Sequence, residues 1–419
     1  MNASPLLRPF RALRAAPRHA PEVAAPPYDV VSVDEAREHA RGHPWSFFHI
    51  SRPEIDLPPG ADPYAPQAYG KAGEAMQRMI AEGVLIRDER PFYYVYRMTS
   101  GTHRQTGIAA AAAVAAYNSG RIRRHELTRP EKERDRARQI EAVGAHTGPV
   151  FVMHRPSAAV AGVAAAAADG EALADVTDAR GVRHQVWRVE DADAEARLSA
   201  AFAAMPALYV ADGHHRAAAA VRVAGGRGDR QPAAAEALAG WFLVVSFPSD
   251  EVRILDYNRI VRDLNGHTAA TLLDALAGVF TVEPADGPVR PLRKHTFGMV
   301  LEDRWYRLAL RNAPPAEANP VARLDVSLLS RLVLDPLLGI CDPRTDPRID
   351  FVGGSRGLEA LERMVGTGTY AVGFSLYPTA LADLMAVADA GEVMPPKSTW
   401  FEPKLADGLL SLPLDDSAA

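Results

Sequence analysis

An apolar run, a glycine-containing turn and an alanine-rich stretch follow one another directly near the middle of the sequence. Residues 207–210 are apolar, Ala211-Asp212-Gly213-His214-His215-Arg216 comes next, and residues 217–221 are four alanines and a valine. The apolar run is typical of a strand, glycine permits a tight turn, and alanine has the highest helix propensity. The segment therefore predicts a strand, a turn and a helix, with the polar side chains at the N-terminus of the helix.

The polar residues of this turn favour an anionic ligand. Free N–H groups and the helix dipole attract anions at a helix N-terminus, and Gly213 brings the backbone to that point. His214, His215 and Arg216 add charge-assisted donors suited to phosphate. Asp212 repels phosphate, so we expect it to bind Mg²⁺ or to orient a histidine. A plain Asp-Gly turn, with Asp212 as helix cap and histidines that only satisfy buried groups, is the structural alternative.

The same motif carries a family resemblance. Asp-Gly-His-His-Arg after an apolar strand resembles the signature of the ParB/sulfiredoxin-like superfamily, especially its free serine kinases, which use a nucleoside diphosphate as phosphate donor. Those enzymes have an earlier His-Glu pair before a charged helix, and His125 and Glu126 match it. The resemblance covers about residues 120–225, with an alanine-rich insertion near 157–174. It implies a ParB-like central region that binds nucleotide.

Over its full length the sequence is identified as a member of a bacterial family of proteins of unknown function, family 1015. The matching segments are residues 8–14, 25–32, the two motifs, 348–354 and 394–399. Since a fold or family of this kind implies no activity, function has to be argued from the site.

Composition sets outer bounds on the fold and the partners. The chain has 419 residues, of which 47% are hydrophobic and 24% charged, as in globular proteins with two or three subdomains. A net charge of −5 gives no support for a nucleic-acid surface. One cysteine, Cys341, fits a reducing cytoplasm, and we expect it to be a packing residue. No stretch is apolar enough for a membrane span or a signal peptide, so we expect a cytoplasmic protein.

A second candidate site lies in a proline-stiffened loop near the end of the sequence. Only five of the 47 basic residues are lysines: Lys71, Lys132, Lys294, Lys397 and Lys404. A retained lysine is therefore a candidate for a required compact ammonium. Pro395 and Pro396 precede Lys397, Ser398 and Thr399, which together offer an ammonium and two hydroxyls for a phosphate. The loop lacks the glycines of a Walker motif. We expect Lys397 to bring the C-terminal region to the phosphate site, with a rigid connector as the alternative.

The order of elements predicts an α+β fold with mixed sheets. We expect an N-terminal region at 1–120, a ParB-like region at 121–230 and a C-terminal subdomain at 240–419, with a loop at 225–229 as the boundary. A helix near 67–82, two strands at 241–247 and 252–260, a hairpin over 297–310 and a closing strand near 409–413 belong to this prediction.

The sequence therefore favours phosphoryl transfer on a small metabolite, with serine or O-phosphoserine as the best guess from the resemblance. Glu126 is expected to be the general base, assisted by Asp212 and His214. The expected substrate- and phosphate-binding residues are His125, Gly213, His215, Arg216, Lys397, Ser398 and Thr399. A kinase would use ADP or ATP and a phosphohydrolase would use water.

The sequence leaves three alternatives to a phosphoryl-transfer enzyme open. It does not indicate an oligomeric state. The first is a non-enzymatic nucleotide or metabolite sensor of ParB-like type. The second is a transition-metal site made by Asp212, His214, His215 and Glu126, which Arg216 would oppose. The third is a nucleic-acid-binding protein or nuclease, which the acidic balance disfavours.

Overall fold

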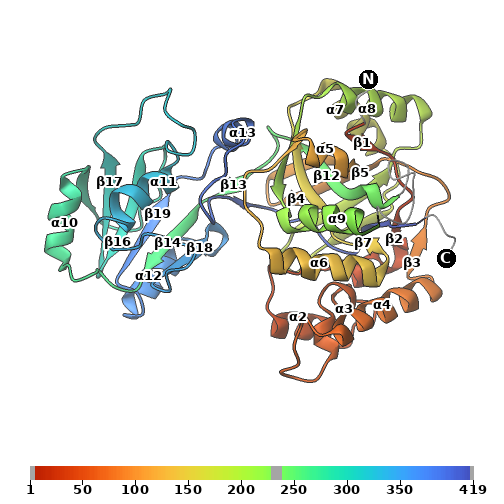
Figure 1. Ribbon diagram of the computed structural model, residues 1–419, viewed down its shortest axis with the longest axis horizontal. Helices are drawn as coiled ribbons and strands as arrows, with labels where there is room; N and C mark the ends of the chain where they lie inside the picture. The colour runs from red at the N-terminus through yellow and green to blue at the C-terminus, as the bar shows by residue number, and fades with distance from the viewer. Residues whose placement is uncertain (1–4, 228–237, 416–419) are drawn as a thin grey trace. The chain divides into compact units, whose positions relative to one another are not determined.

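The computed structural model describes residues 5–227 and 238–415, which divide into two compact units (Figure 1). Unit 1 extends to Val252 and includes the segment from Pro403 onward, and unit 2 runs from Arg253 to Glu402. Both units combine helices with β-sheets, which confirms the predicted α+β class. Among the helices of the described ranges, none combines the length and the apolar character that a bilayer span requires.

A nine-stranded mixed sheet forms the centre of unit 1, in the order β6-β11-β8-β12-β5-β4-β10-β9, with β1 also paired to β5. The pairs β11–β6 and β12–β8 are parallel and the others antiparallel. The strands are β1 Leu7–Arg8, β4 Tyr94–Ser100, β5 His103–Ala113, β6 Ile122–Arg123, β8 Val150–His154, β9 Ala174–Thr177, β10 Arg183–Arg188, β11 Leu208–Asp212 and β12 Trp241–Pro248.

A smaller four-stranded sheet ties the C-terminal segment into unit 1. Its order is β3 (Leu85–Arg87), β2 (Leu13–Ala15), β21 (Leu410–Pro413) and β7 (Ala145–His146). Because β21 pairs with both β2 and β7, the residues just before it are also carried into unit 1. This pairing positions Lys404 and Asp407 for the site described below.

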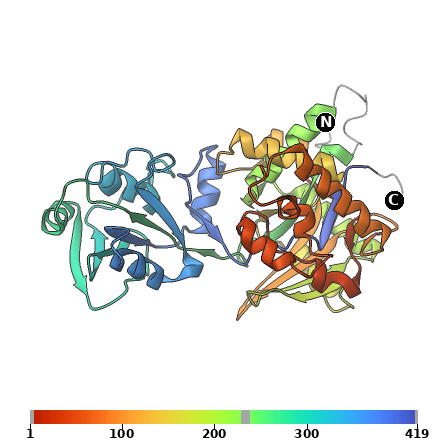
Figure 2. The same cartoon turned by 90° about the horizontal axis from the view of Figure 1, so that it is seen from below.

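The helices of unit 1 pack around these sheets, and α6 and α9 lie side by side (Figures 1 and 2). An apolar cluster joins this pair, made by Ala137, Ile140, Ala219, Val223 and Leu414. The helices are α1 Ala20–Val23, α2 Val33–Ala40, α3 Phe48–Ser51, α4 Pro66–Ala81, α5 Val114–Asn118, α6 Pro130–Val143, α7 Ala158–Ala167, α8 Ala192–Ala204 and α9 His214–Arg227.

Unit 2 is built on a six-stranded antiparallel sheet in the order β15-β17-β16-β19-β14-β18. Its core includes Ile260, Val300, Trp305 and Leu361, which are at most 3% exposed. The elements are β13 Ile254–Leu255, β14 Tyr257–Val261, α10 Ala269–Ala277, β15 Phe280–Ala285, β16 Thr296–Leu301, β17 Arg304–Leu310, α11 Asp325–Leu329, β18 Ile349–Gly353, α12 Leu358–Gly366, β19 Val372–Leu376, α13 Leu381–Asp389 and β20 Trp400–Phe401, which pairs with β13.

The two units differ from the three regions expected from the sequence. Residues 1–120 and 121–230 share one sheet, because β4 and β5 pair with strands from the second region and with β12. The strands β12 and β14, expected as consecutive strands of one subdomain, belong to different sheets. A local sequence pattern indicates which residues form a strand. The sheet that the strand joins depends on hydrogen bonding to residues that are distant in the sequence.

Two local expectations also change. Gly225 and Gly226 lie inside α9 and not in a loop, because the helix continues to its end at Arg227. The remainder of the expected boundary, residues 228–237, lies outside the described residues. Cys341, expected to pack in the interior, is exposed.

Candidate active site

The turn between β11 and α9 is shaped by a glycine. Gly213 has φ +90°, and a Cβ there would lie 3.4 Å from the Cα of Val150 on β8. The backbone N–H groups of Arg216 and Ala217 donate to the Gly213 carbonyl at 2.9 and 3.1 Å, which closes the first helical turn. Since the first N–H groups of a helix have no intrahelical acceptor, this end of α9 offers donors to a ligand.

His125 and Glu126 lie in the loop before α6 and meet His214. The Glu126 Oε2 is 3.6 Å from the His214 Nδ1, and the rings of His125 and His214 stand edge to face with centroids 4.6 Å apart. Both histidines are buried, whereas the Glu126 side chain is 43% exposed. Burial lowers the pKa of His214 to about 4 and that of His125 well below its usual value, so both rings are neutral at pH 7.

Asp212 faces a lysine that the sequence did not assign to it. The Lys404 Nζ donates to its Oδ2 at 2.7 Å, and the Gly213 N–H donates to its Oδ1 at 3.0 Å. Burial by itself would raise the pKa of Asp212, but the Lys404 ammonium outweighs burial and lowers this pKa to about 2. Both carboxylate oxygens already accept a donor, and the Lys404 ammonium balances the charge that would attract a Mg²⁺ ion to Asp212.

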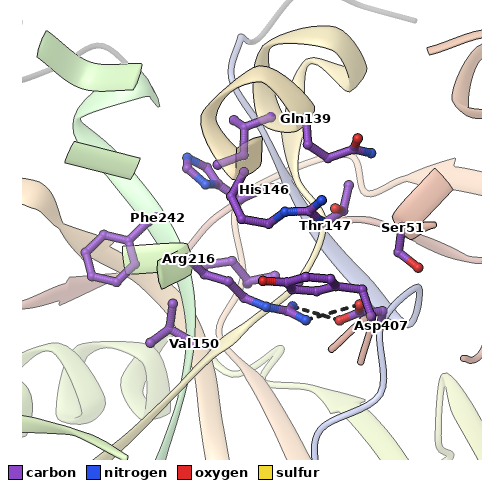
Figure 3. Close-up of a pocket in the computed structure, with 13 residues that line it drawn as sticks. Ser51, Gln139, His146, Thr147, Val150, Arg216, Phe242 and Asp407 are labelled. Atoms are coloured by element: carbon purple, nitrogen blue, oxygen red, sulfur yellow. Dashed lines mark hydrogen bonds and ion pairs between the residues drawn. The ribbon is translucent and has the colours of Figure 1, made fainter. Parts of the chain in front are cut away.

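Arg216 is held in an ion pair with Asp407. Its two Nη atoms donate to the Asp407 carboxylate at 2.8 and 3.2 Å (Figure 3). Although burial disfavours the charged guanidinium, Asp407 raises the pKa of Arg216 above its usual value. Gly148 makes room for this pair, since a Cβ there would lie 1.3 Å from the Arg216 Nη1. A phosphate at the turn would therefore have to compete with Asp407 or use the remaining N–H groups of Arg216.

The other histidine of the motif is also engaged. The Nε2 of His215 accepts a hydrogen bond from the backbone N–H of Arg129 at 3.1 Å. Burial lowers the pKa of His215, so the ring is a neutral donor through its other nitrogen at pH 7. Thus His215 links the turn to the residue just before α6.

Described residues of unit 1 line a small cavity and a larger one. The first surrounds the Arg216–Asp407 pair, has a volume of about 30 Å³, and is lined in part by Ser51, Gln139 and Thr147 (Figure 3). It is large enough for water and too small for a metabolite. The second has a volume of about 430 Å³, within the range of small-molecule sites, and Lys404 lines it. Its wall also includes Glu35, His39, Phe48, Asp178, Arg180 and His184.

The expected phosphate loop lies in unit 2, whereas the turn lies in unit 1. Lys397 is exposed at φ +55°, and its Nζ is 5.7 Å from the ring centroid of Tyr257. Ser398 is buried and donates from its Oγ to the Pro395 carbonyl at 2.6 Å, and Thr399 follows it. Their participation in the site stays a prediction.

Sequence reasoning missed Lys404, Asp407 and Gly148 as parts of the site. The scarcity of lysine did mark Lys404 as a candidate, but the prolines beside Lys397 favoured the latter. No motif in the neighbouring sequence identifies Asp407 or Gly148 as a site residue. Their role depends on contact with Arg216, which is distant in the sequence.

Comparison with known proteins places the chain among proteins of unknown function. The family model for DUF1015, described as a protein of unknown function, matches residues 7–327. The chain belongs to this family. Among curated proteins, none matches the sequence of this DUF1015 chain.

Solved structures resemble this DUF1015 chain only distantly. A free serine kinase mutant in complex with AMP is similar at 12% identity and a TM-score of 0.37, over 74% of this chain and 91% of that chain. A conserved hypothetical protein from Pyrococcus furiosus shares 12% identity at a TM-score of 0.35, over 74% and 96%. SbnI with C-terminal truncation, from Staphylococcus aureus, shares 12% at 0.37, over 73% and 87%.

Proposed function

We propose that this DUF1015 protein transfers a phosphoryl group to or from a small hydroxyl-bearing metabolite, with serine and O-phosphoserine as the best candidates. The observation that carries the proposal is the half-exposed carboxylate of Glu126, 3.6 Å from His214 at the N-terminus of α9. A general base must be accessible to substrate, and a helix N-terminus favours a phosphate. Both requirements are met where the loop before α6 meets the N-terminus of α9.

In this proposal Glu126 takes the proton from the attacking hydroxyl or water. The backbone N–H groups of α9 and the neutral rings of His214 and His215 hold the phosphoryl oxygens. Lys404 holds Asp212 in an ion pair beside the turn and can offer its other N–H groups to the phosphate, where positioning supplies most of the catalysis. Arg216 acts through Asp407 to fix the turn, as a positioning residue.

A nucleotide donor, ADP or ATP, distinguishes a kinase from a phosphohydrolase at this site. The cavity of about 430 Å³ that Lys404 lines has the volume for such a donor. A Mg²⁺ ion would then enter bound to the phosphates, as is usual for this ion, since both oxygens of Asp212 accept protein donors.

The test is turnover of the purified full chain with serine plus ADP or ATP, and separately with O-phosphoserine, following phosphoserine and released phosphate. Glu126→Gln should lower turnover by at least about 10²-fold, because it removes the base. Glu131→Gln, an exposed change in the first turn of α6, is the matched control and should retain turnover. Full turnover by Glu126→Gln would refute the assignment. Nucleotide bound without turnover of any substrate would instead identify a sensor.

A further inference from the structure

We infer that unit 1 contains a transition-metal site formed by His125, Glu126 and His214. One ligand atom from each of these three residues lies within 4.8 Å of the other two. Ligand atoms around a tetrahedral Zn²⁺ ion with bonds of about 2.0–2.1 Å are about 3.4 Å apart. Glu126 and His214 are already 3.6 Å apart, and a movement on the order of 1 Å among these three side chains would close the ligands on an ion.

The second observation is a set of buried ring nitrogens that lack a well-formed hydrogen bond. Within the described ranges, the Nε2 of His214 is buried without a hydrogen-bond partner, and the ring of His125 interacts with the backbone of Val210 but has no well-formed hydrogen bond. His125 is 2% exposed and His214 is 4% exposed. A buried polar atom without a partner is rare in native proteins. A coordinated cation would supply a partner for one nitrogen of each ring.

The donor set selects the class of metal. Two imidazoles and one carboxylate are the ligands of catalytic Zn²⁺ and of non-haem Fe²⁺ sites, whereas Mg²⁺ and Ca²⁺ prefer oxygen. The set leaves positions open for water or a substrate oxygen.

This set differs from the metal site that the sequence allowed. Asp212 is engaged by Lys404 and His215 by Arg129, and His125 takes their place beside Glu126 and His214. The repulsion expected from Arg216 is also reduced, because Asp407 neutralises its charge in a bidentate ion pair.

The inference goes beyond the proposed function and stands or falls separately from it. Glu126 cannot take a proton with an oxygen that is bound to a metal. If both statements hold, Zn²⁺ loading should therefore lower the turnover that depends on Glu126.

Zn²⁺ binding to the chelator-treated full chain tests the inference, by isothermal titration calorimetry and by elemental analysis after gel filtration. We expect one equivalent of Zn²⁺ and a higher Tm for the loaded protein, because the ion binds the folded state. His125→Gln, His214→Gln and Glu126→Gln should each weaken binding at least about tenfold, the lower end of the effect of losing even an outer partner of a metal ligand. His267→Gln, a histidine of unit 2 that lines neither cavity, should bind like the wild type.

Circular dichroism first checks that each variant keeps the wild-type fold. If a variant of a buried histidine does not fold, Glu126→Gln still tests the site, because the Glu126 side chain is half-exposed. Absence of stoichiometric Zn²⁺, or equal affinity in the wild type and Glu126→Gln, would overturn the inference. Zn²⁺ binding by a protein whose metal-free form turns over no substrate would leave the metal site standing and refute the proposed enzyme. Turnover by a protein that binds no metal would support the proposed enzyme and refute the metal site.

Discussion

Replacing Gly148 by alanine should break the Arg216–Asp407 ion pair without changing either of its partners. The new Cβ would lie 1.3 Å from the Arg216 Nη1, 2.3 Å from its Cζ and 3.0 Å from the Asp407 Oδ1. Since unbonded heavy atoms meet at about 3.5 Å, the guanidinium must move by about 2 Å. That movement breaks bonds of 2.8 and 3.2 Å to a carboxylate that is only 3% exposed. Breaking a buried pair costs about 3–5 kcal/mol, which we expect as the loss in unfolding free energy.

Urea unfolding followed by circular dichroism measures this loss. Gly162→Ala in α7 is the matched control, because a Cβ there meets nothing within 4 Å, and it should stabilise by about 0.5–1 kcal/mol. The loss should largely vanish when Gly148→Ala is made on an Arg216→Ala/Asp407→Asn background. If Gly148→Ala behaves like Gly162→Ala, or if its loss persists on that background, the pair is not what the glycine accommodates.

Three further outcomes follow from individual groups. Burial raises the pKa of Asp325 to about 7, so the native state retains a proton between pH 4 and 7 that the unfolded chain releases. The contribution of protonated Asp325 to the unfolding free energy is complete below about pH 4 and falls by up to about 1.4 kcal/mol per pH unit as the pH rises to 7. Asp325→Asn should remove this pH dependence of the unfolding free energy, measured by urea unfolding at each pH. Lys404→Met leaves Asp212 without its ammonium, so the pKa of Asp212 should rise and the variant should lose stability relative to the wild type as the pH rises from 4 to 7. Ser32→Ala, which removes the N-cap of α2, should lower the unfolding free energy by about 1 kcal/mol in urea.

Elements that depend on neighbouring residues could be predicted from the sequence. The helix α4, the strand and helix on either side of Gly213, and the hairpin of β16 and β17 lie within a few residues of the predicted bounds. Each is set by local periodicity or by one turn residue. The partners of the strands could not be predicted, because β12 and β14 are close in sequence but join different sheets.

The same distinction holds for the candidate site. Glu126 and His214 carry recognisable motifs, and the structure brings them to 3.6 Å. Lys397 and Lys404 are equally conspicuous as rare lysines, and only the course of the chain separates them. The pairing of β21 with β2 and β7 draws Lys404 into unit 1, where it meets Asp212, whereas Lys397 stays in unit 2. No pattern around either lysine encodes this outcome.

The two ion pairs at the turn explain why the C-terminal segment belongs to the site. The turn contributes a carboxylate, Asp212, and a cation, Arg216; the segment before β21 contributes the complementary cation, Lys404, and carboxylate, Asp407. Each pair cancels its own charge, so neither cation presents a full positive charge to a phosphate. A phosphate that binds here must draw on the N–H groups of α9 and on neutral imidazoles, or on a cation that it brings or finds. The histidines and the carboxylate that meet at Glu126 are the groups of this site that could hold such a cation, which is why metal loading is the decisive variable for its chemistry.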